Sequence, residues 1–326
     1  MKKLFITFRG KRKDQDTTFK GDVVAEPTFL LVDETDKRLD PDDGITAKRF
    51  LTELNRRLAD NPHDDSDGCP SVLFFVHGFN TDDRGSIKAR NRIENGLRKH
   101  GFKGLLVSID WPSYGDIVSY PFDRQRVRET AVKLATLIVK TRGFGNADPE
   151  CRIPINIVAH SMGALLVRET MENVAKDHAI KATDFALDQV VLIAADISSN
   201  SLRLDDGRSY GLFQHTARLT NYFSRFDSAL DVSNKKPFNG SSRVGRVGLP
   251  ELAPEKAYDV DTTEYYKTAY GGDNGFEKSH TWYFRDDIFL KDLTETLSGR
   301  TDRAAIGMRE PATNFKSMRL GPFNIV

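Results

Sequence analysis

Short runs of apolar residues recur along the chain, and several of them are followed by stretches with helical spacing. This alternation is typical of βαβ units and of a parallel sheet. The apolar runs with strand character are Leu4–Phe8, Thr28–Val32, Ser71–Val76, Gly104–Ile109, Ile153–Ala159, Gln189–Ala194 and, alternating less cleanly, Arg218–Ser224. Apolar residues at helical spacing occupy Ile45–Leu58, Val127–Val139, Ala164–Ala175 and Asp286–Leu297. We therefore predict an α/β fold with a mostly parallel central sheet.

The apolar runs also indicate how the sheet is covered. Within two of these runs, Val72–Val76 and Ile155–Ala159 are almost continuously apolar, as expected of strands that helices bury on both faces. The first two runs precede any strand–helix alternation and are joined by a polar, basic segment. They predict an antiparallel hairpin at the N-terminal edge of the sheet.

One long segment, residues 233–277, shows no clear periodicity and is rich in Gly, Ser, Arg and Tyr. Long loops in compact domains are often functional, so we expect substrate-recognition elements or a lid there. The length of 326 residues permits two domains, but α/β folds of this size often form one. We predict a single domain over residues 1–326.

Composition excludes several classes of protein. The chain has 48 basic and 47 acidic residues, for a formal net charge of +1, so nothing favours general binding of nucleic acid. No apolar run approaches the roughly 20 residues that span a bilayer, and the N-terminal apolar stretch is too short for a signal peptide. The two cysteines, Cys69 and Cys151, form no disulfide framework. We expect a cytoplasmic protein.

The strongest local motif is Ala159-His160-Ser161-Met162-Gly163, which lies between an apolar strand and a helical stretch. A nucleophile elbow needs this context, because a sharp strand-to-helix turn exposes the serine hydroxyl. Small residues must stand two positions before and after the serine, and Ala159 and Gly163 meet that need. The motif predicts Ser161 as a nucleophile. The alternative is a serine that only caps the following helix.

A nucleophilic serine needs a base, and in this arrangement the chain order is serine, acid, histidine. Three histidines follow Ser161: His178, His215 and His280. His178 falls at the end of the helix after the serine, and His215 lies in a polar stretch before the seventh strand. His280 lies just before the last helix, where this order places the base, so we predict His280.

Two aspartates compete for the role of the acid. Asp227 follows the seventh predicted strand, and Asp196 follows the strand before it. A carboxylate at either place would orient the imidazole and stabilise its charged form. We favour Asp227. Asp196 would then cap a helix or support the loop.

The oxyanion of an acyl-transfer intermediate needs two backbone N–H donors. We predict that they come from Met162, next to the nucleophile, and from Phe79, in the loop after the third predicted strand. Gly78 permits close approach of the backbone there. His77 and His160 are interpreted as buried residues that brace these two turns.

With these motifs in hand, the chain resembles a bacterial family of α/β-hydrolases catalogued as domain of unknown function DUF900. The resemblance covers roughly residues 70–295. It implies the α/β-hydrolase fold, an esterase- or lipase-like triad of Ser161, Asp227 and His280, and alanine as the usual residue at position 159. The stretches that carry it are Phe75-Val76-His77-Gly78-Phe79-Asn80, Ile109-Asp110-Trp111-Pro112-Ser113, Tyr120 with Asp123, Ala159-His160-Ser161-Met162-Gly163, Ala194-Ala195-Asp196, Ser224-Arg225-Phe226-Asp227-Ser228-Ala229-Leu230, Arg243-Val244-Gly245, and His280 with Tyr283.

Four further residues are candidates for substrate binding. Trp111 and Tyr120 should lie near the carboxyl end of the fourth strand and could line an acyl pocket, although core packing explains Trp111 equally well. Arg243 and Arg246 could bind a carboxylate or phosphate of the substrate. Solvated loop charges are the alternative for both arginines.

These residues together predict a serine hydrolase that cleaves carboxylic esters through an acyl-enzyme. Acyltransferases, thioesterases and amidases would use the same residues, and a non-catalytic binding protein could keep the fold. We find no metal or nucleotide motif and expect no cofactor. A small ester or acyl compound is the expected partner. The oligomeric state, the acyl chain and the leaving group do not follow from the sequence.

Overall fold

The computed structural model describes residues 2–11, 19–60, 71–113, 119–140, 153–177, 185–234, 242–272, 275–312 and 317–321. Cys69, Cys151 and His178 lie outside these ranges. The strands are β1 (Lys3–Lys11), β2 (Phe19–Val32), β3 (Gly44–Ile45), β4 (Val72–Val76), β5 (Leu105–Asp110), β6 (Ile155–His160), β7 (Leu187–Ile193), β8 (Thr216–Phe223), β9 (Ala257–Asp261), β10 (Arg309–Pro311) and β11 (Ser317–Leu320). The α-helices are α1 (Ala47–Asp60), α2 (Asp83–Lys99), α3 (Tyr120–Lys140), α4 (Met162–Val174), α6 (Tyr210–Gln214), α7 (Ser228–Asn234), α8 (Val244–Val247), α9 (Thr263–Tyr270), α10 (Phe276–Thr281) and α11 (Asp287–Ser298), and the 3-10 helices are η1 (Pro41–Asp43), η2 (Ser199–Leu202) and η3 (Trp282–Arg285).

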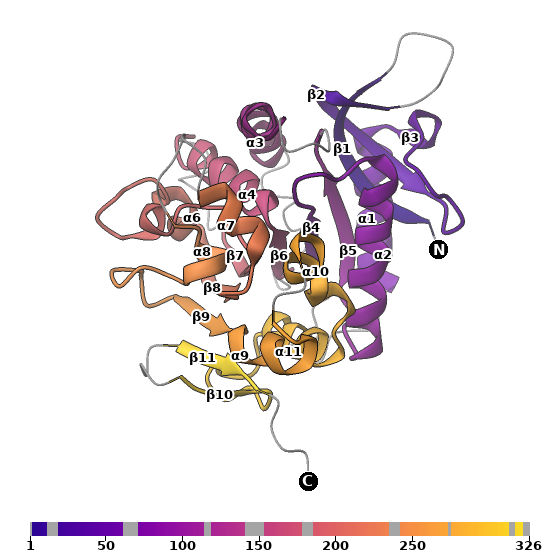
Figure 1. Ribbon diagram of the computed structural model, residues 1–326. Helices are drawn as coiled ribbons and strands as arrows, with labels where there is room; N and C mark the ends of the chain where they lie inside the picture. The colour runs from indigo at the N-terminus through magenta and orange to yellow at the C-terminus, as the bar shows by residue number, and fades with distance from the viewer. Residues whose placement is uncertain are drawn as a thin grey trace.

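The described strands form one sheet in the order β10-β11-β9-β8-β7-β6-β4-β5-β1-β2-β3. Every pairing from β1 through β5, β4, β6, β7, β8 and β9 to β11 is parallel. The antiparallel pairs stand at the two ends, with β1, β2 and β3 at one end and β10 and β11 at the other (Figure 1). The predicted parallel sheet with an N-terminal antiparallel hairpin is confirmed.

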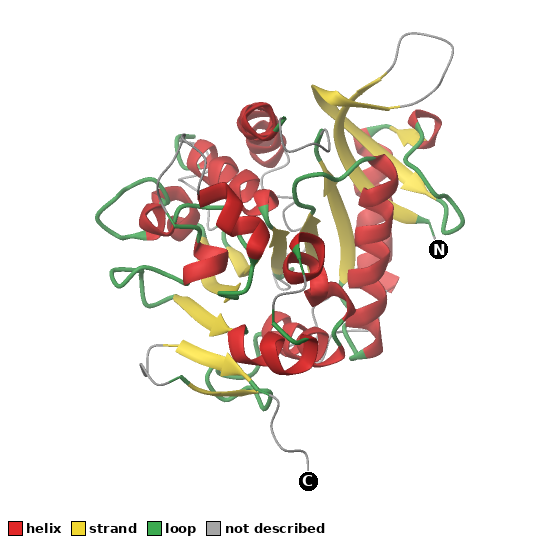
Figure 2. Ribbon diagram, in the orientation of Figure 1, coloured by secondary structure: helices red, strands yellow, loops and turns green. Residues whose placement is uncertain are grey.

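The apolar run of β4 shows why this sheet is buried on both sides. Its alternate residues Val72, Phe74 and Val76 pack in a core cluster that includes side chains of α3 and α4. Leu73 and Phe75 point the other way and pack with side chains of α2 and α11. Helices accordingly lie on both sides of the strands (Figure 2). Among the described residues, no helix combines the length and the apolar character needed to cross a membrane.

Two parts of the fold differ from the sequence expectation. Helix α2 was not predicted, because its sequence is mostly polar and has few apolar side chains; those it has, such as Ile93 and Leu97, face the core. Residues 233–277 were expected to form a loop, and this is wrong for much of the segment. Strand β9 pairs with β8 in the centre of one half of the sheet, and α9 follows it. The Tyr-Asp-Val-Asp stretch of β9 is too short and too polar to stand out as a strand.

Candidate active site

Ser161 occupies a strained turn between the end of β6 and the start of α4. Its φ of 53° and ψ of −123° lie outside the regions that L-residues prefer, and such a conformation costs about 1–3 kcal/mol. The neighbouring strand β7 holds the turn in place. The Ser161 N–H donates to the Ile193 carbonyl at 3.0 Å, and the Asp196 N–H donates to the Ser161 carbonyl at 3.0 Å.

Two glycines allow the backbones around Ser161 to approach each other. A Cβ on Gly163 would lie 2.4 Å from the His77 carbonyl oxygen, so no larger residue fits without moving the backbone. A Cβ on Gly78 would lie 2.8 Å from the Cβ of Ser161. The loop after β4 therefore packs directly against the serine turn, which is the close approach expected from the sequence.

His280, on α10, is hydrogen-bonded to Asp227, which lies between β8 and α7. The His280 Nδ1 is 2.7 Å from the Asp227 Oδ2, and the Asp227 side chain is fully buried. Burial lowers the pKa of His280, but the charge of Asp227 and the hydrogen bond to it outweigh burial, so this pKa lies above its ordinary value. Of the two aspartates considered from the sequence, the structure places Asp227 at the imidazole.

Asp196 is held in a different network at the end of β7. Its Oδ2 accepts a hydrogen bond from the Tyr120 hydroxyl at 2.7 Å, and its Oδ1 lies 3.0 Å from the Nε of Arg243. Arg124 lies 3.7 Å from the same carboxylate. Asp196 therefore fixes the phenol of Tyr120 and, through its backbone, the turn at Ser161.

His160 is buried beneath the serine turn and contacts the backbone of His280. Its Nε2 lies 3.0 Å from the His280 carbonyl oxygen. Burial, reinforced by the nearby His280, lowers the pKa of His160 to about 3, so the ring is neutral near pH 7. A carbonyl only accepts hydrogen bonds. The proton of His160 is therefore on Nε2.

The loop after β4 is anchored by a buried charge network. The Arg9 Nε donates to the Asp110 Oδ2 at 2.8 Å, and the His77 Nε2 lies 3.1 Å from the Asp110 Oδ1. Burial opposes the charge of Asp110, but Arg9 and His77 hold the pKa of this carboxyl well below its usual range. Arg9 also donates to the Thr81 carbonyl at 2.7 Å. His77 thus braces the loop, in agreement with its interpretation from the sequence.

The two predicted oxyanion donors belong to segments that contact each other at Ser161: Met162 follows the serine directly, and Phe79 follows Gly78, which packs against the Ser161 side chain. Met162 is the first residue of α4, and the first amides of a helix have no acceptor within the helix. In the loop after β4, the Asn80 N–H is already engaged by the Ser113 hydroxyl at 2.8 Å, whereas Phe79 precedes this anchored position. Asn80 has a φ of 58°, which turns the loop beside Ser161.

A cavity of about 630 Å³ opens over Ser161, within the size range of small-molecule sites. Side chains of α2, α7 and α10 border it, together with the loop after β4. Its apolar lining includes Phe79, Leu230, Phe276 and Phe284. The described residues that line it are Phe75, His77, Gly78, Phe79, Asn80, Thr81, Gly85, Lys88, Ala89, Arg92, Tyr120, His160, Ser161, Asp196, Ala229, Leu230, Phe276, Glu277, His280, Thr281 and Phe284.

Of the four residues predicted to bind substrate, Tyr120 alone lines this cavity. Trp111 is fully buried and stacks on His77 with ring centroids 5.4 Å apart, so the core-packing alternative holds for it. Arg243 is only 1 % exposed and pairs with Asp196, which corrects both the anion-binding and the solvated interpretations. Arg246 donates to the Asp227 carbonyl at 2.7 Å and so supports the acid.

Several lining residues were not identified from the sequence. Lys88 and Arg92 lie on α2, whose polar pattern gave no helix signal, and Phe276 begins α10. Phe276 is 48 % exposed at the cavity. Once α2 is recognised, the spacing of four residues between Lys88 and Arg92 places them on one face of the helix.

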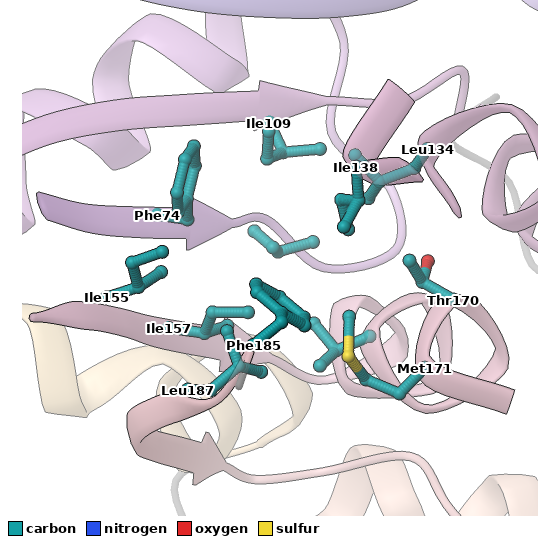
Figure 3. A pocket seen from close by; sticks show the side chains of 12 residues that line it. Phe74, Ile109, Leu134, Ile138, Ile155, Ile157, Thr170, Met171, Phe185 and Leu187 are labelled. Atoms are coloured by element: carbon teal, nitrogen blue, oxygen red, sulfur yellow. The ribbon is translucent and has the colours of Figure 1, made fainter. Parts of the chain in front are cut away.

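A second cavity, of about 40 Å³, lies between the sheet and helices α3 and α4 (Figure 3). Phe74, Ile109 and Ile157 enter it from the strands, and Ile138 and Met171 from the helices. Its lining is apolar apart from Thr170, whose hydroxyl donates to the Leu166 carbonyl. It holds neither Ser161 nor His280 and offers no chemistry. Over the described ranges, no grouping of three or more His, Cys, Asp or Glu side chains could hold a metal ion.

Solved structures of several hydrolases are similar to this chain. A cutinase-like protein from Cryptococcus sp. shares 12 % identity over 73 % of this chain and 100 % of its own, with a TM-score of 0.37. A lipase-esterase related protein from Clostridium acetobutylicum shares 12 % identity over 62 % and 90 %, with a TM-score of 0.32. The Trichoderma reesei cutinase with a bound phosphonate inhibitor shares 9 % over 78 % and 93 %, with a TM-score of 0.31. No curated protein matches the sequence significantly.

A family profile gives the firmer assignment. It is described as an alpha/beta hydrolase of unknown function, DUF900, and it matches residues 47–262. The match starts and ends earlier in the sequence than the region of roughly 70–295 that the motifs indicate. It therefore includes Ser161 and Asp227 but not His280. It confirms the α/β-hydrolase fold. The chain belongs to the DUF900 family of α/β-hydrolases.

Proposed function

We propose that this protein is a serine hydrolase that cleaves carboxylic esters through an acyl-enzyme, with Ser161, His280 and Asp227 as the catalytic triad. The observation that carries the proposal is the 2.7 Å contact between His280 Nδ1 and Asp227 Oδ2. This contact leaves His280 Nε2 as the ring nitrogen for Ser161, and both residues line the same cavity. The strained backbone of Ser161 is the form that a nucleophile elbow needs.

In the proposed reaction, the Ser161 Oγ attacks the ester carbonyl while His280 Nε2 takes the hydroxyl proton. The amides of Met162 and Phe79 stabilise the oxyanion. The C–O bond to the alcohol then breaks, and the alcohol leaves with the proton from His280. Water attacks the acyl-enzyme, again giving a proton to His280, and the carboxylic acid departs as the serine hydroxyl is restored. Asp227 stays charged and stabilises the imidazolium.

Acyl transfer to another acceptor, thioester cleavage and amide cleavage would use the same groups. Apolar side chains in the lining, among them Phe79, Leu230 and Phe284, favour an uncharged acyl group at the serine, which all of these reactions share. We place ester hydrolysis first because it needs no acceptor other than water and no stronger activation of the leaving group. The cytoplasmic location stays a prediction from the sequence.

The test is hydrolysis of 4-nitrophenyl esters of graded acyl length by the wild type and by Ser161→Ala. We expect turnover by the wild type with a burst of about one 4-nitrophenol per protein if deacylation is slower than acylation. We expect Ser161→Ala to lose about 10³-fold or more of the rate. Equal measurable rates for the two proteins would exclude Ser161 as the nucleophile. A folded wild type that hydrolyses none of these esters would support the non-catalytic binding protein instead.

A further inference from the structure

The mouth of the cavity over Ser161 carries two cations on one helix. Lys88 and Arg92 stand four residues apart on α2, so they share a face, and both line the cavity. Both residues are exposed to solvent. A ligand in the cavity would therefore contact two positive charges that remain partly hydrated.

These two cations differ from most of their neighbours on α2. Arg90 and Arg98 pair with Glu94, and Lys99 pairs with Asp287. Among the described residues, neither Lys88 nor Arg92 has a carboxylate at ion-pair distance. Their charges are therefore not committed to holding the fold.

The carboxylates of the described lining do not cancel these charges. Asp196 is engaged by Arg243 and by the Tyr120 hydroxyl, which leaves Glu277, an exposed residue of α10, as the other acidic side chain of the lining. Other lining side chains are apolar, and Leu230 and Phe284 among them are buried. The cavity thus combines an apolar interior with a cationic rim.

We propose that the site takes carboxylic esters that carry an anionic group, a carboxylate or a phosphate, several bonds from the scissile carbonyl, and that Lys88 and Arg92 bind this group. The inference rests on the proposed ester hydrolysis. The apolar part of the substrate would occupy the interior, and the anion would stay at the rim, partly in water. We expect a preference of about 3- to 10-fold for the anionic substrate, which lies within the range that two exposed ion pairs supply.

The experiment compares two matched ester pairs, because an ester can carry the anion on either side of the scissile bond and each pair tests one side. On the acyl side, mono-4-nitrophenyl suberate is compared with its methyl ester. On the alcohol side, 3-(4-acetoxyphenyl)propanoate is compared with its methyl ester. We expect kcat/KM to favour the anionic member of at least one pair by about 3- to 10-fold. The preference should decline when NaCl is raised, because exposed charges are screened.

The double variants Lys88→Gln with Arg92→Gln and Lys88→Glu with Arg92→Glu then assign the preference to these residues. The ratio of anionic to neutral kcat/KM should fall to about one in the first and below one in the second. Arg84→Gln with Lys291→Gln is the control, since it removes two charges that do not line the cavity, and it should keep the wild-type ratio.

The outcomes distinguish failure of the anion-binding inference from failure of the proposed ester hydrolysis. Hydrolysis of the neutral esters without any preference for the anionic ones would overturn this inference alone. A preference that survives both double variants would also overturn it, because other groups would then bind the anion. Absence of hydrolysis for all four esters would overturn the proposed function and this inference together.

Discussion

The Nε2 atom of His160 lies 3.0 Å from the backbone carbonyl oxygen of His280. The residue before the proposed nucleophile thus donates a hydrogen bond to the backbone of the proposed base. Since the pKa of His160 is lowered to about 3, this contact persists as a neutral hydrogen bond across the working pH range. It links the serine turn to α10, two segments that are far apart in the sequence.

This contact predicts different effects of two substitutions at His160. His160→Leu removes the donor and should lower kcat by about 10- to 100-fold through misplacement of His280, with KM little changed. His160→Gln keeps an N–H donor and should recover most of the rate. Steady-state kinetics on folded variants checks this. If both variants are equally impaired, or if leucine is tolerated, the hydrogen bond does not position the base.

The pKa of His280 predicts the pH dependence of the reaction. His280 must be neutral to accept the serine proton, and its pKa is raised above 6.5 chiefly by the charge of Asp227 against the opposing effect of burial. The kcat/KM should therefore rise with pH through a midpoint above 6.5. This is measured as the pH profile of ester hydrolysis under pseudo-first-order conditions.

Asp227→Asn extends this test. Without the carboxylate, burial lowers the pKa of His280, so the midpoint should move to lower pH. The rate at the plateau should fall by about 10³- to 10⁴-fold, because the imidazolium loses its partner. An unchanged midpoint in Asp227→Asn would mean that another group, such as Asp196, sets the pKa of the base.

The interior of the sheet and the position of the nucleophile could be predicted from the sequence because their signals are local. β4 is continuously apolar and β6 is mostly so, and Ser161 follows β6 directly, where the strand meets a helical pattern. By contrast, α2 buries only a few of its side chains, and β9 is short and largely polar although both of its edges pair with the neighbouring strands β8 and β11. Their place in the fold depends on long-range pairing, which no local pattern records.

The substrate-binding candidates also depend on long-range contacts that no local pattern predicts. Arg243 was assigned either to an anion or to solvent because its partner, Asp196, lies 47 positions away in the sequence and meets it only in the folded chain at 3.0 Å. Trp111 follows β5 directly, but the stacked His77 covers it. The position of a residue after a predicted strand indicates that it lies at the carboxyl end of the sheet. It does not indicate which distant residue will contact and bury it.

Gly163 predicts a sharp steric effect. Gly163→Ala would place a Cβ 2.4 Å from the His77 carbonyl oxygen, so the backbone at the serine turn must shift. We expect a loss of about 1–3 kcal/mol in unfolding free energy and a large loss of ester hydrolysis. Gly307→Ala is the matched control, since no atom lies within 4 Å of its added Cβ, and it should stay within about 0.5 kcal/mol. Equal behaviour of the two variants in urea unfolding would contradict the close packing.

The buried pair of Arg9 and Asp110 predicts a pH-dependent change in stability. Arg9→Met leaves Asp110 buried without its main partner and should lower the unfolding free energy by about 3–5 kcal/mol near pH 7. In the wild type the pKa of Asp110 is depressed, so its stabilisation is present above the unfolded pKa of about 3.9 and is lost only as the pH falls towards the depressed value. In the variant, burial raises that pKa, so the difference between the two proteins should shrink towards pH 5.

Lys99→Met is the control for this prediction, because Lys99 and its partner Asp287 are both more than half exposed. It should change the unfolding free energy by less than about 1 kcal/mol. Urea unfolding of the three proteins at pH 7 and pH 5 gives the comparison. A loss in Arg9→Met that is no larger than that of the control would show that the network under the loop after β4 is dispensable for stability.

The most direct test of the central claim is intact-mass analysis after treatment with a fluorophosphonate, which reacts with activated serines. The wild type and Ser161→Ala are treated side by side, and circular dichroism verifies that both are folded. The account predicts one adduct on the wild type and none on Ser161→Ala. No adduct on the folded wild type, or an adduct that persists in Ser161→Ala, would contradict an activated nucleophile at this position.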